Sequence, residues 1–131
     1  WNDPMSFICG KGHPLSQLKQ VLPEDLSKHN AILPSQSTLT YRVVESIFKE
    51  NKLVLNAKIP TNYLETMKMM ASVGMGWSVL PNTMIDEELY TLPVNQPILN
   101  RQLGAISYEK KQLGRAALAF LETAEGVWGR I

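Results

Sequence analysis

The chain has 131 residues, 44% of them hydrophobic, and a formal net charge of +1 from 13 basic and 12 acidic side chains. This length suits one compact domain, and the balanced charge gives no general attraction to nucleic acid, anionic membranes or acidic partners. The single cysteine, Cys9, excludes an internal disulfide, and no apolar run approaches the roughly 20 residues that span a bilayer.

The first third of the chain alternates extended and helical patterns. The apolar run 5–9 predicts a buried strand, which the turn residues of 10–14 end. The sequence of 23–26 is typical of a short helix start, because proline suits the first turn and acidic side chains suit that end of the helix dipole. The apolar run 31–33 predicts another strand.

A longer helix is expected after the hydroxyl-rich loop 35–38. Apolar residues at helical spacing predict that this helix covers about 39–51, with Ser37 or Thr38 as its N-cap. The apolar residues of 53–59 then predict an extended strand, which a proline ends.

The next helix is expected to begin at Asn62. Asparagine is a favourable N-cap, and Glu65 follows three residues later, as in a capping box. Gly74 is expected to end the helix, because glycine adopts the left-handed C-cap conformation without steric cost.

Strands are expected over 77–80, 89–94 and 101–108, and the apolar stripe of 113–124 predicts a final helix that ends near Gly126. The alternation of strands and helices with short connections favours parallel βαβ units, packed as an α/β layer.

The order of these motifs resembles the LysR-type transcriptional regulators over nearly the whole chain. The general pieces are GHPL at 12–15, PEDL at 23–26 and RQLG at 101–104. The most specific pieces are TNYLETM at 61–67 and ASVGMGWSVLP at 71–81.

This resemblance implies the effector-binding domain of such a regulator, with the two-lobed α/β fold of type 2 periplasmic binding proteins. It implies that about 8–94 form the second lobe and that about 95–131 form the segment that returns to the first lobe. The family's N-terminal winged helix-turn-helix and the opening half of the first lobe have no counterpart in this sequence.

The implied function is to sense a small organic effector in the cytoplasm and to change transcription, without catalysis. The implied partners are the effector, other copies in a homodimer or homotetramer of the full-length protein, and DNA only through the missing domain. Met69, which the helical spacing directs away from the core, suits such an interface between copies. A solute-binding protein of a transport system has the same cleft architecture and is the alternative.

No cofactor or metal is expected. Neither His13 nor His29 has a second ligand at metal-like spacing. Cys9, in an apolar strand, is interpreted as a small buried hydrophobe rather than a redox sensor. There is also no nucleophile elbow and no phosphate-binding glycine loop.

The expected effector site lies at two helix N-termini, in polar loops that each follow a predicted strand. Free backbone N–H groups and the helix dipole attract an anion to such ends, so an organic anion is favoured. Ligands of open α/β sheets bind outside the carboxyl ends of the strands, so the two loops are expected to line one crevice. The alternative is that the side chains only cap the helices. The candidate residues are Ser35, Gln36, Ser37, Thr38, Thr61 and Asn62.

Overall fold

The computed structural model describes residues 1–96, 99–109 and 112–128, and the chain divides into two compact units. The larger unit is Pro4–Asn100. The smaller unit combines Trp1–Asp3 with Arg101–Ile131. None of the helices in the described residues is long and apolar enough to cross a membrane.

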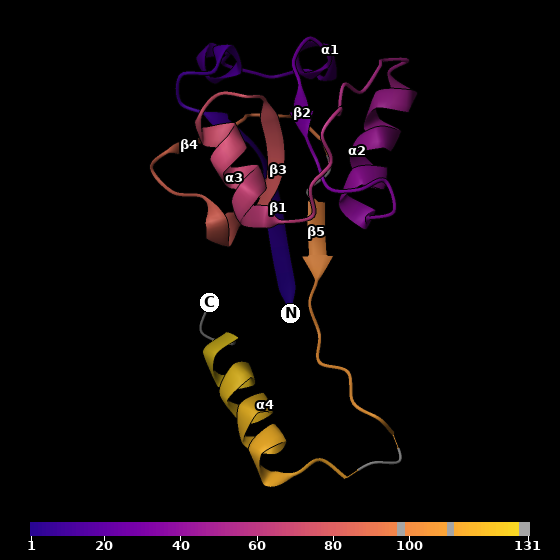
Figure 1. Cartoon of the computed structure of the whole chain (residues 1–131), viewed down its shortest axis with the longest axis vertical. Coiled ribbons are helices and arrows are strands. Elements are labelled where there is room, and N and C mark those ends of the chain that lie inside the picture. Colours follow the sequence, from indigo (N-terminus) through magenta and orange to yellow (C-terminus); the bar gives the residue numbers. More distant parts are fainter. Residues whose placement is uncertain (97–98, 110–111, 129–131) are drawn as a thin grey trace. The chain divides into compact units, whose positions relative to one another are not determined.

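A mixed sheet forms the centre of the larger unit (Figure 1). The strand order is β2-β3-β1-β4, and β5 also pairs with β1. The strands are β1 (Asn2–Gly10), β2 (Ala31–Ile32), β3 (Trp77–Pro81), β4 (Leu89–Thr91) and β5 (Leu99–Gln102).

The expectation of parallel βαβ units holds for one pair of strands only. β2 and β3 are parallel, with α2 (Leu39–Glu50) and α3 (Leu64–Ser72) in the crossover between them. The prediction was wrong for β1, which is antiparallel to both β3 and β4. The connection 11–30 contains only short helical turns and does not cross back to the edge where β1 began, so β2 runs in the direction opposite to β1.

Different helices cover the two faces of the sheet, because alternate residues of a strand point to opposite faces. The helices α1 (Pro23–Ser27) and α2 cover one face, and α3 covers the other. The first core cluster includes Met5, Phe7, Cys9, Leu26, Val44, Phe48, Trp77 and Val79. The second consists of Ile8, Ile32, Met67, Met70, Ala71, Leu80 and Leu89.

Trp77 is the largest fully buried side chain of the first cluster. Its ring centroid lies 5.9 Å from the rings of both Phe7 and Phe48, and it stacks on Phe48 at an interplanar angle of 14°. The indole N–H donates a hydrogen bond to the Leu26 carbonyl oxygen at 3.0 Å. Trp77 therefore joins β1, β3, α1 and α2 in one core.

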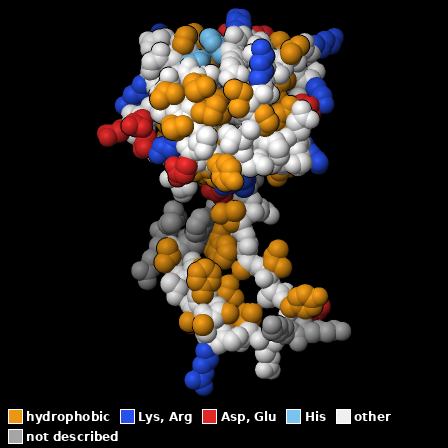
Figure 2. Space-filling model, in the orientation of Figure 1, with side chains coloured by type: hydrophobic (Ala, Val, Ile, Leu, Met, Phe, Trp, Pro, Cys, Tyr) orange, Lys and Arg blue, Asp and Glu red, His pale blue; other side chains and the backbone are white. Residues whose placement is uncertain are grey.

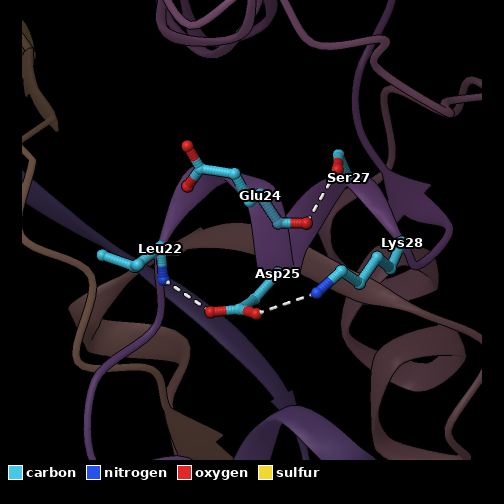
Figure 3. A network of polar contacts seen from close by, with 5 residues as sticks. All are labelled: Leu22, Glu24, Asp25, Ser27 and Lys28. Atoms are coloured by element: carbon cyan, nitrogen blue, oxygen red, sulfur yellow. Dashed lines mark hydrogen bonds and ion pairs between the residues drawn. The ribbon is translucent and has the colours of Figure 1, made fainter.

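The short helix α1 begins where its proline and acidic residues predict (Figure 3). The Asp25 carboxylate accepts a hydrogen bond from the Leu22 backbone N–H at 3.1 Å and pairs with Lys28 at 3.4 Å. The Ser27 hydroxyl donates to the Glu24 carbonyl oxygen at 2.7 Å. These local contacts hold a helix of five residues that has little helical stability of its own.

The longer helices follow the sequence signals at most of their ends. Thr38 is the N-cap of α2, as expected, and its hydroxyl oxygen accepts a hydrogen bond from the Tyr41 N–H at 3.3 Å. Gly74 follows the end of α3 with a φ of +86°, so the expected left-handed ending is confirmed. The final predicted helix is α4 (Arg115–Trp128).

The strand predicted over 53–59 was wrong, because this segment belongs to no strand. Two backbone hydrogen bonds join residues 53–61 to residues 31–33. The Ala31 N–H donates to the Asn56 carbonyl oxygen at 2.7 Å, and the Thr61 N–H donates to the Leu33 carbonyl oxygen at 3.3 Å. Two bonds so far apart do not make a ladder.

The two later strands are also shorter than expected. β4 ends at Thr91, and Val94 forms an isolated bridge with Val21. β5 ends at Gln102, so most of the strand predicted over 101–108 was wrong. Leu103 still exchanges backbone hydrogen bonds with Trp1, at 2.6 and 2.8 Å.

The smaller unit contains α4, the segment before it and the first three residues. Within it, the Arg101 guanidinium pairs with the carboxylate of Asp3, which is 3% exposed, and the Arg101 Nε to Asp3 Oδ2 distance is 2.9 Å. Across 101–109 and 112–127, no side chain is buried.

Candidate functional site

The two polar loops that were expected to share a crevice meet at one edge of the sheet. The backbone N–H of Ser35 donates a hydrogen bond to the side-chain oxygen of Asn62 at 2.9 Å. The loop 35–38 follows the carboxyl end of β2, and α2 and α3 both begin at this edge (Figure 1). The expected proximity of the two loops is confirmed.

Within the first loop, most polar groups bond to one another. The Ser35 carbonyl oxygen accepts from both the N–H and the hydroxyl of Thr38, at 3.0 and 2.8 Å. The hydroxyls of Ser35 and Ser37 share a hydrogen bond of 2.9 Å. Gln36 and Ser37 are exposed, so their side chains are open to solvent at the start of α2. The Thr38 hydroxyl both donates a hydrogen bond, to the Ser35 carbonyl oxygen, and accepts one, from the Tyr41 N–H.

The second loop differs from its expected capping box. The N-cap of α3 is Tyr63, which makes no side-chain capping bond, so the prediction that Asn62 caps this helix with Glu65 was wrong. The Asn62 side-chain oxygen, which was expected to cap α3, instead accepts a hydrogen bond from the Ser35 N–H. Thr61 accepts a hydrogen bond from the Tyr63 N–H at 3.3 Å.

Several backbone N–H groups in the described residues at this edge have no hydrogen-bond acceptor. The first N–H groups of a helix have no intrahelical acceptor, and the helix dipole gives them a partial positive charge. Glu65 is the one acidic side chain in the first turn of either helix, and it is exposed. In the described residues, no hydrogen bond occupies the backbone N–H groups of Gln36, Ser37, Leu39, Thr40, Leu64, Glu65 and Thr66.

Such an arrangement offers hydrogen-bond donors that suit an anion. Two helix N-termini, a free amide group on Asn62 and exposed hydroxyls offer hydrogen-bond donors to a carboxylate or a similar group. The sequence predicted that the two loops lie close together but missed the way in which Asn62 joins them, because that bond links residues 27 positions apart.

Cys9 lies outside this edge and is fully buried, as interpreted from the sequence. Burial raises the pKa of its thiol from 9.0 to about 11, because the charged thiolate is poorly solvated there. The reactive thiolate form is therefore rare at neutral pH.

His13 and His29 lie against each other, a contact that sequence spacing did not reveal. Their rings meet edge to face with centroids 4.8 Å apart, and the Leu15 N–H donates to His13 Nδ1 at 3.2 Å. Burial lowers the pKa of His13 below its usual value, and the charge of His29 lowers it further. Over the described part of the chain, no three His, Cys, Asp or Glu side chains gather as metal ligands.

Comparison with known proteins gives a consistent family. The family model of the LysR substrate binding domain matches residues 1–128. The HTH-type transcriptional activator CmpR of Synechocystis is 27% identical over 132 residues, which cover 92% of this chain and 41% of CmpR. The chain thus spans about two fifths of the length of this curated relative.

Solved structures share the fold at lower sequence identity. The regulatory domain of CcmR from Synechocystis, in complex with 2-PG, superposes with a TM-score of 0.70 at 23% identity. That match covers 96% of this chain and 63% of the CcmR chain. The effector binding domain of QuiR, in complex with shikimate, has a TM-score of 0.66 at 18% identity and covers 94% and 60% of the two chains.

Proposed function

The chain belongs to the LysR substrate-binding domain family, and from that premise we propose that it senses a small organic anion for a transcriptional regulator. Proteins of this family are transcriptional regulators rather than enzymes in general, and CmpR is named as a transcriptional activator. We propose no catalytic step for this chain.

The observation that carries the proposal is the hydrogen bond between Ser35 and Asn62, which holds the N-termini of α2 and α3 at one edge. An exposed helix dipole contributes only about 0.3–1 kcal/mol to binding an anion. Two helix ends with several free N–H groups act together, and that combination supports useful affinity. In this proposal the effector contacts the two loops of residues 35–38 and 61–62.

The proposed place of the chain in a longer protein follows the two-lobed fold. Residues of about 8–94 form the second lobe, and about 95–131 return to the first lobe. The match to 63% of the CcmR regulatory domain supports a domain larger than this chain. Contact with DNA, in this proposal, belongs to a winged helix-turn-helix outside the chain.

The outer side of α3 supports association between copies of the regulator. Met69 points away from the core and is 59% exposed, and Val73, one turn later, is 69% exposed. Figure 2 shows hydrophobic side chains gathered on the face that carries this helix. Exposed apolar patches of this kind mark interaction surfaces, so we propose a homodimer or homotetramer of the full-length protein in the cytoplasm. No observation favours the alternative of a solute-binding transport protein.

The experiment that tests the proposal is a thermal-shift screen of the sensor domain with both lobes present. The panel contains small organic acids, including shikimate, and an uncharged amide or alcohol analogue of each. A ligand at one hundred times its dissociation constant stabilises the folded state by about 2.7 kcal/mol. We expect a dose-dependent shift from at least one acid and none from its uncharged analogue.

A matched pair of serine variants locates the binding site. Ser37→Ala removes an exposed hydroxyl at the proposed site, whereas Ser72→Ala removes an exposed hydroxyl at the far end of α3. We expect the first variant to reduce the shift and the second to leave it unchanged. A shift from the uncharged analogues, or equal effects of the two variants, would contradict the proposed site.

A further inference from the structure

Two histidines that the proposed effector site does not use lie against each other in the larger unit. The rings of His13 and His29 meet edge to face, with centroids 4.8 Å apart. His13 lies in the turn after β1 and is 6% exposed, whereas His29 lies between α1 and β2 and is half-buried. Figure 2 shows histidine side chains (pale blue) at the surface of this unit, so solvent protons reach the pair.

His13 organises the turn in which it lies. Its Nδ1 accepts a hydrogen bond from the Leu15 N–H at 3.2 Å, and its carbonyl oxygen accepts from the N–H and the hydroxyl of Ser16, at 2.9 and 2.7 Å. Its own N–H donates to the Gly10 carbonyl oxygen at 3.0 Å. Because an imidazole nitrogen that accepts a hydrogen bond carries no proton, this turn requires the neutral ring, with its proton on Nε2.

His29 is held by the segment that leads from α1 to β2. Its N–H donates to the Leu26 carbonyl oxygen at 3.1 Å. The next residue, Asn30, donates from its side chain to the Met75 carbonyl oxygen at 3.2 Å and accepts from the Trp77 N–H at 3.0 Å. A displacement of His29 therefore acts on the start of β2.

Among the described residues, no carboxylate bonds to either histidine ring. The charged side chains on the segments that meet here are Lys11 of the turn, and Glu24, Asp25 and Lys28 of α1 and its end. Lys28 pairs with Asp25 at 3.4 Å, and none of the four contacts a ring through a hydrogen bond or ion pair. The last turn of α3, whose backbone packs against Gly10, contributes no charged side chain. A proton on one ring therefore meets only the charge of the other ring.

We propose that the two rings form a pH-sensitive contact, which joins the turn 10–17 to the connection from α1 to β2 at neutral pH and releases it in acid. A proton that His13 Nδ1 takes from solvent removes the acceptor of the Leu15 N–H. It also places a positive charge in a buried position against His29. Both effects favour separation of the two segments.

The acid side of the response follows from the direction in which the pKa of His13 is moved. Burial lowers this pKa, and the charge of His29 lowers it further. The folded chain therefore holds the proton less tightly than the unfolded chain does. Stability is complete above the usual value of 6.5 and declines as the pH falls below it. One proton changes the unfolding equilibrium constant by at most about tenfold per pH unit.

Urea denaturation of the 131-residue chain at about pH 7.5 and pH 5.0 tests this contact. His13→Asn keeps an oxygen that suits the capping position but does not titrate. Between the two pH values, we expect the unfolding equilibrium constant of the unmodified chain to rise at least about threefold more than that of His13→Asn. Lys28→Gln removes a charge beside His29 that bonds to neither ring, and it should keep the full pH response. An equal pH response of the unmodified chain and His13→Asn would overturn the proposal.

NMR titration of the histidine ring protons gives a second measurement, which does not require that His13→Asn folds. We expect His13 to titrate below 6.5 and the Leu15 amide signal to shift with the same midpoint. In His29→Gln the midpoint of His13 should move toward 6.5, because one of the two causes that lower it is removed. A midpoint at or above 6.5, or one that His29→Gln leaves unchanged, would also overturn the proposal. Neither measurement includes an effector, so the outcome is independent of the proposed effector site.

Discussion

The two units of the chain differ in how their helices are held. In the unit Pro4–Asn100, α2 and α3 each bury one side against a shared sheet, in two core clusters. In the other unit, α4 has an apolar stripe of similar character, but none of the side chains described after Arg101 is buried. Hydrophobic periodicity predicts helices in both units, yet only one unit contains the surface that such a helix needs.

This difference also distinguishes the proposed binding edge from the smaller unit. The two loops at the starts of α2 and α3 lead into helices that pack against the core, and the hydrogen bond between Ser35 and Asn62 joins them. Apolar side chains of α4 in the smaller unit, such as Phe120, are exposed. Substitutions of the same type in the two units should therefore have opposite or very unequal effects.

The largest expected effect comes from removing a buried aromatic ring. Trp77→Ala in the larger unit should lower the free energy of unfolding by about 3–5 kcal/mol, because it empties a site between Phe7 and Phe48. Phe120→Ala in the smaller unit should change it by less than about 0.5 kcal/mol, because that ring is exposed in this chain. Urea denaturation followed by circular dichroism measures both, and similar losses would refute the contrast.

Replacing either of two glycines by alanine should have a smaller effect on stability, and the two effects should have opposite signs. A Cβ atom at Gly76 would lie 2.2 Å from the Asn30 carbonyl oxygen, which accepts a hydrogen bond from Trp77. Gly76→Ala should therefore destabilise the larger unit by about 3 kcal/mol, at the upper end for overpacking. Nothing lies within 4 Å of a Cβ at Gly126, inside α4.

Gly126→Ala should favour the helical state of α4 by about 0.5–1 kcal/mol, because alanine is the better helix former. Helicity by circular dichroism and the urea midpoint together measure the pair. A stable Gly76→Ala variant, or a destabilised Gly126→Ala variant, would show that the two units are not packed as described.

Local signals predicted the parts of the fold that local chemistry decides. Thr38 caps α2, and Gly74 ends α3 in the left-handed conformation, because both roles depend on neighbouring backbone groups. Short apolar runs likewise predicted β1 and β3. The sequence also indicated both polar loops of the candidate site.

The predictions failed where a distant residue decides the outcome. Asn62 has the right chemistry for an N-cap, but its oxygen accepts from Ser35, which no local pattern reveals. The pairing of Asp3 with Arg101 joins residues 98 positions apart. The segment 53–59 has the composition of a strand, but strand assignment requires a continuous partner that this edge does not supply.

Isothermal titration calorimetry of the complete sensor domain tests the anion site most directly. The titrant is an organic acid that gives a shift in the thermal-shift screen. Asn62→Asp keeps an oxygen that accepts from Ser35 but adds a negative charge between the two helix N-termini. Asn56→Asp adds the same charge in the segment whose backbone bonds to the start of β2. We predict that Asn62→Asp weakens binding at least about tenfold, by like-charge repulsion, and that Asn56→Asp changes it less than about twofold. Unchanged affinity in a folded Asn62→Asp variant would contradict an anion site at this edge.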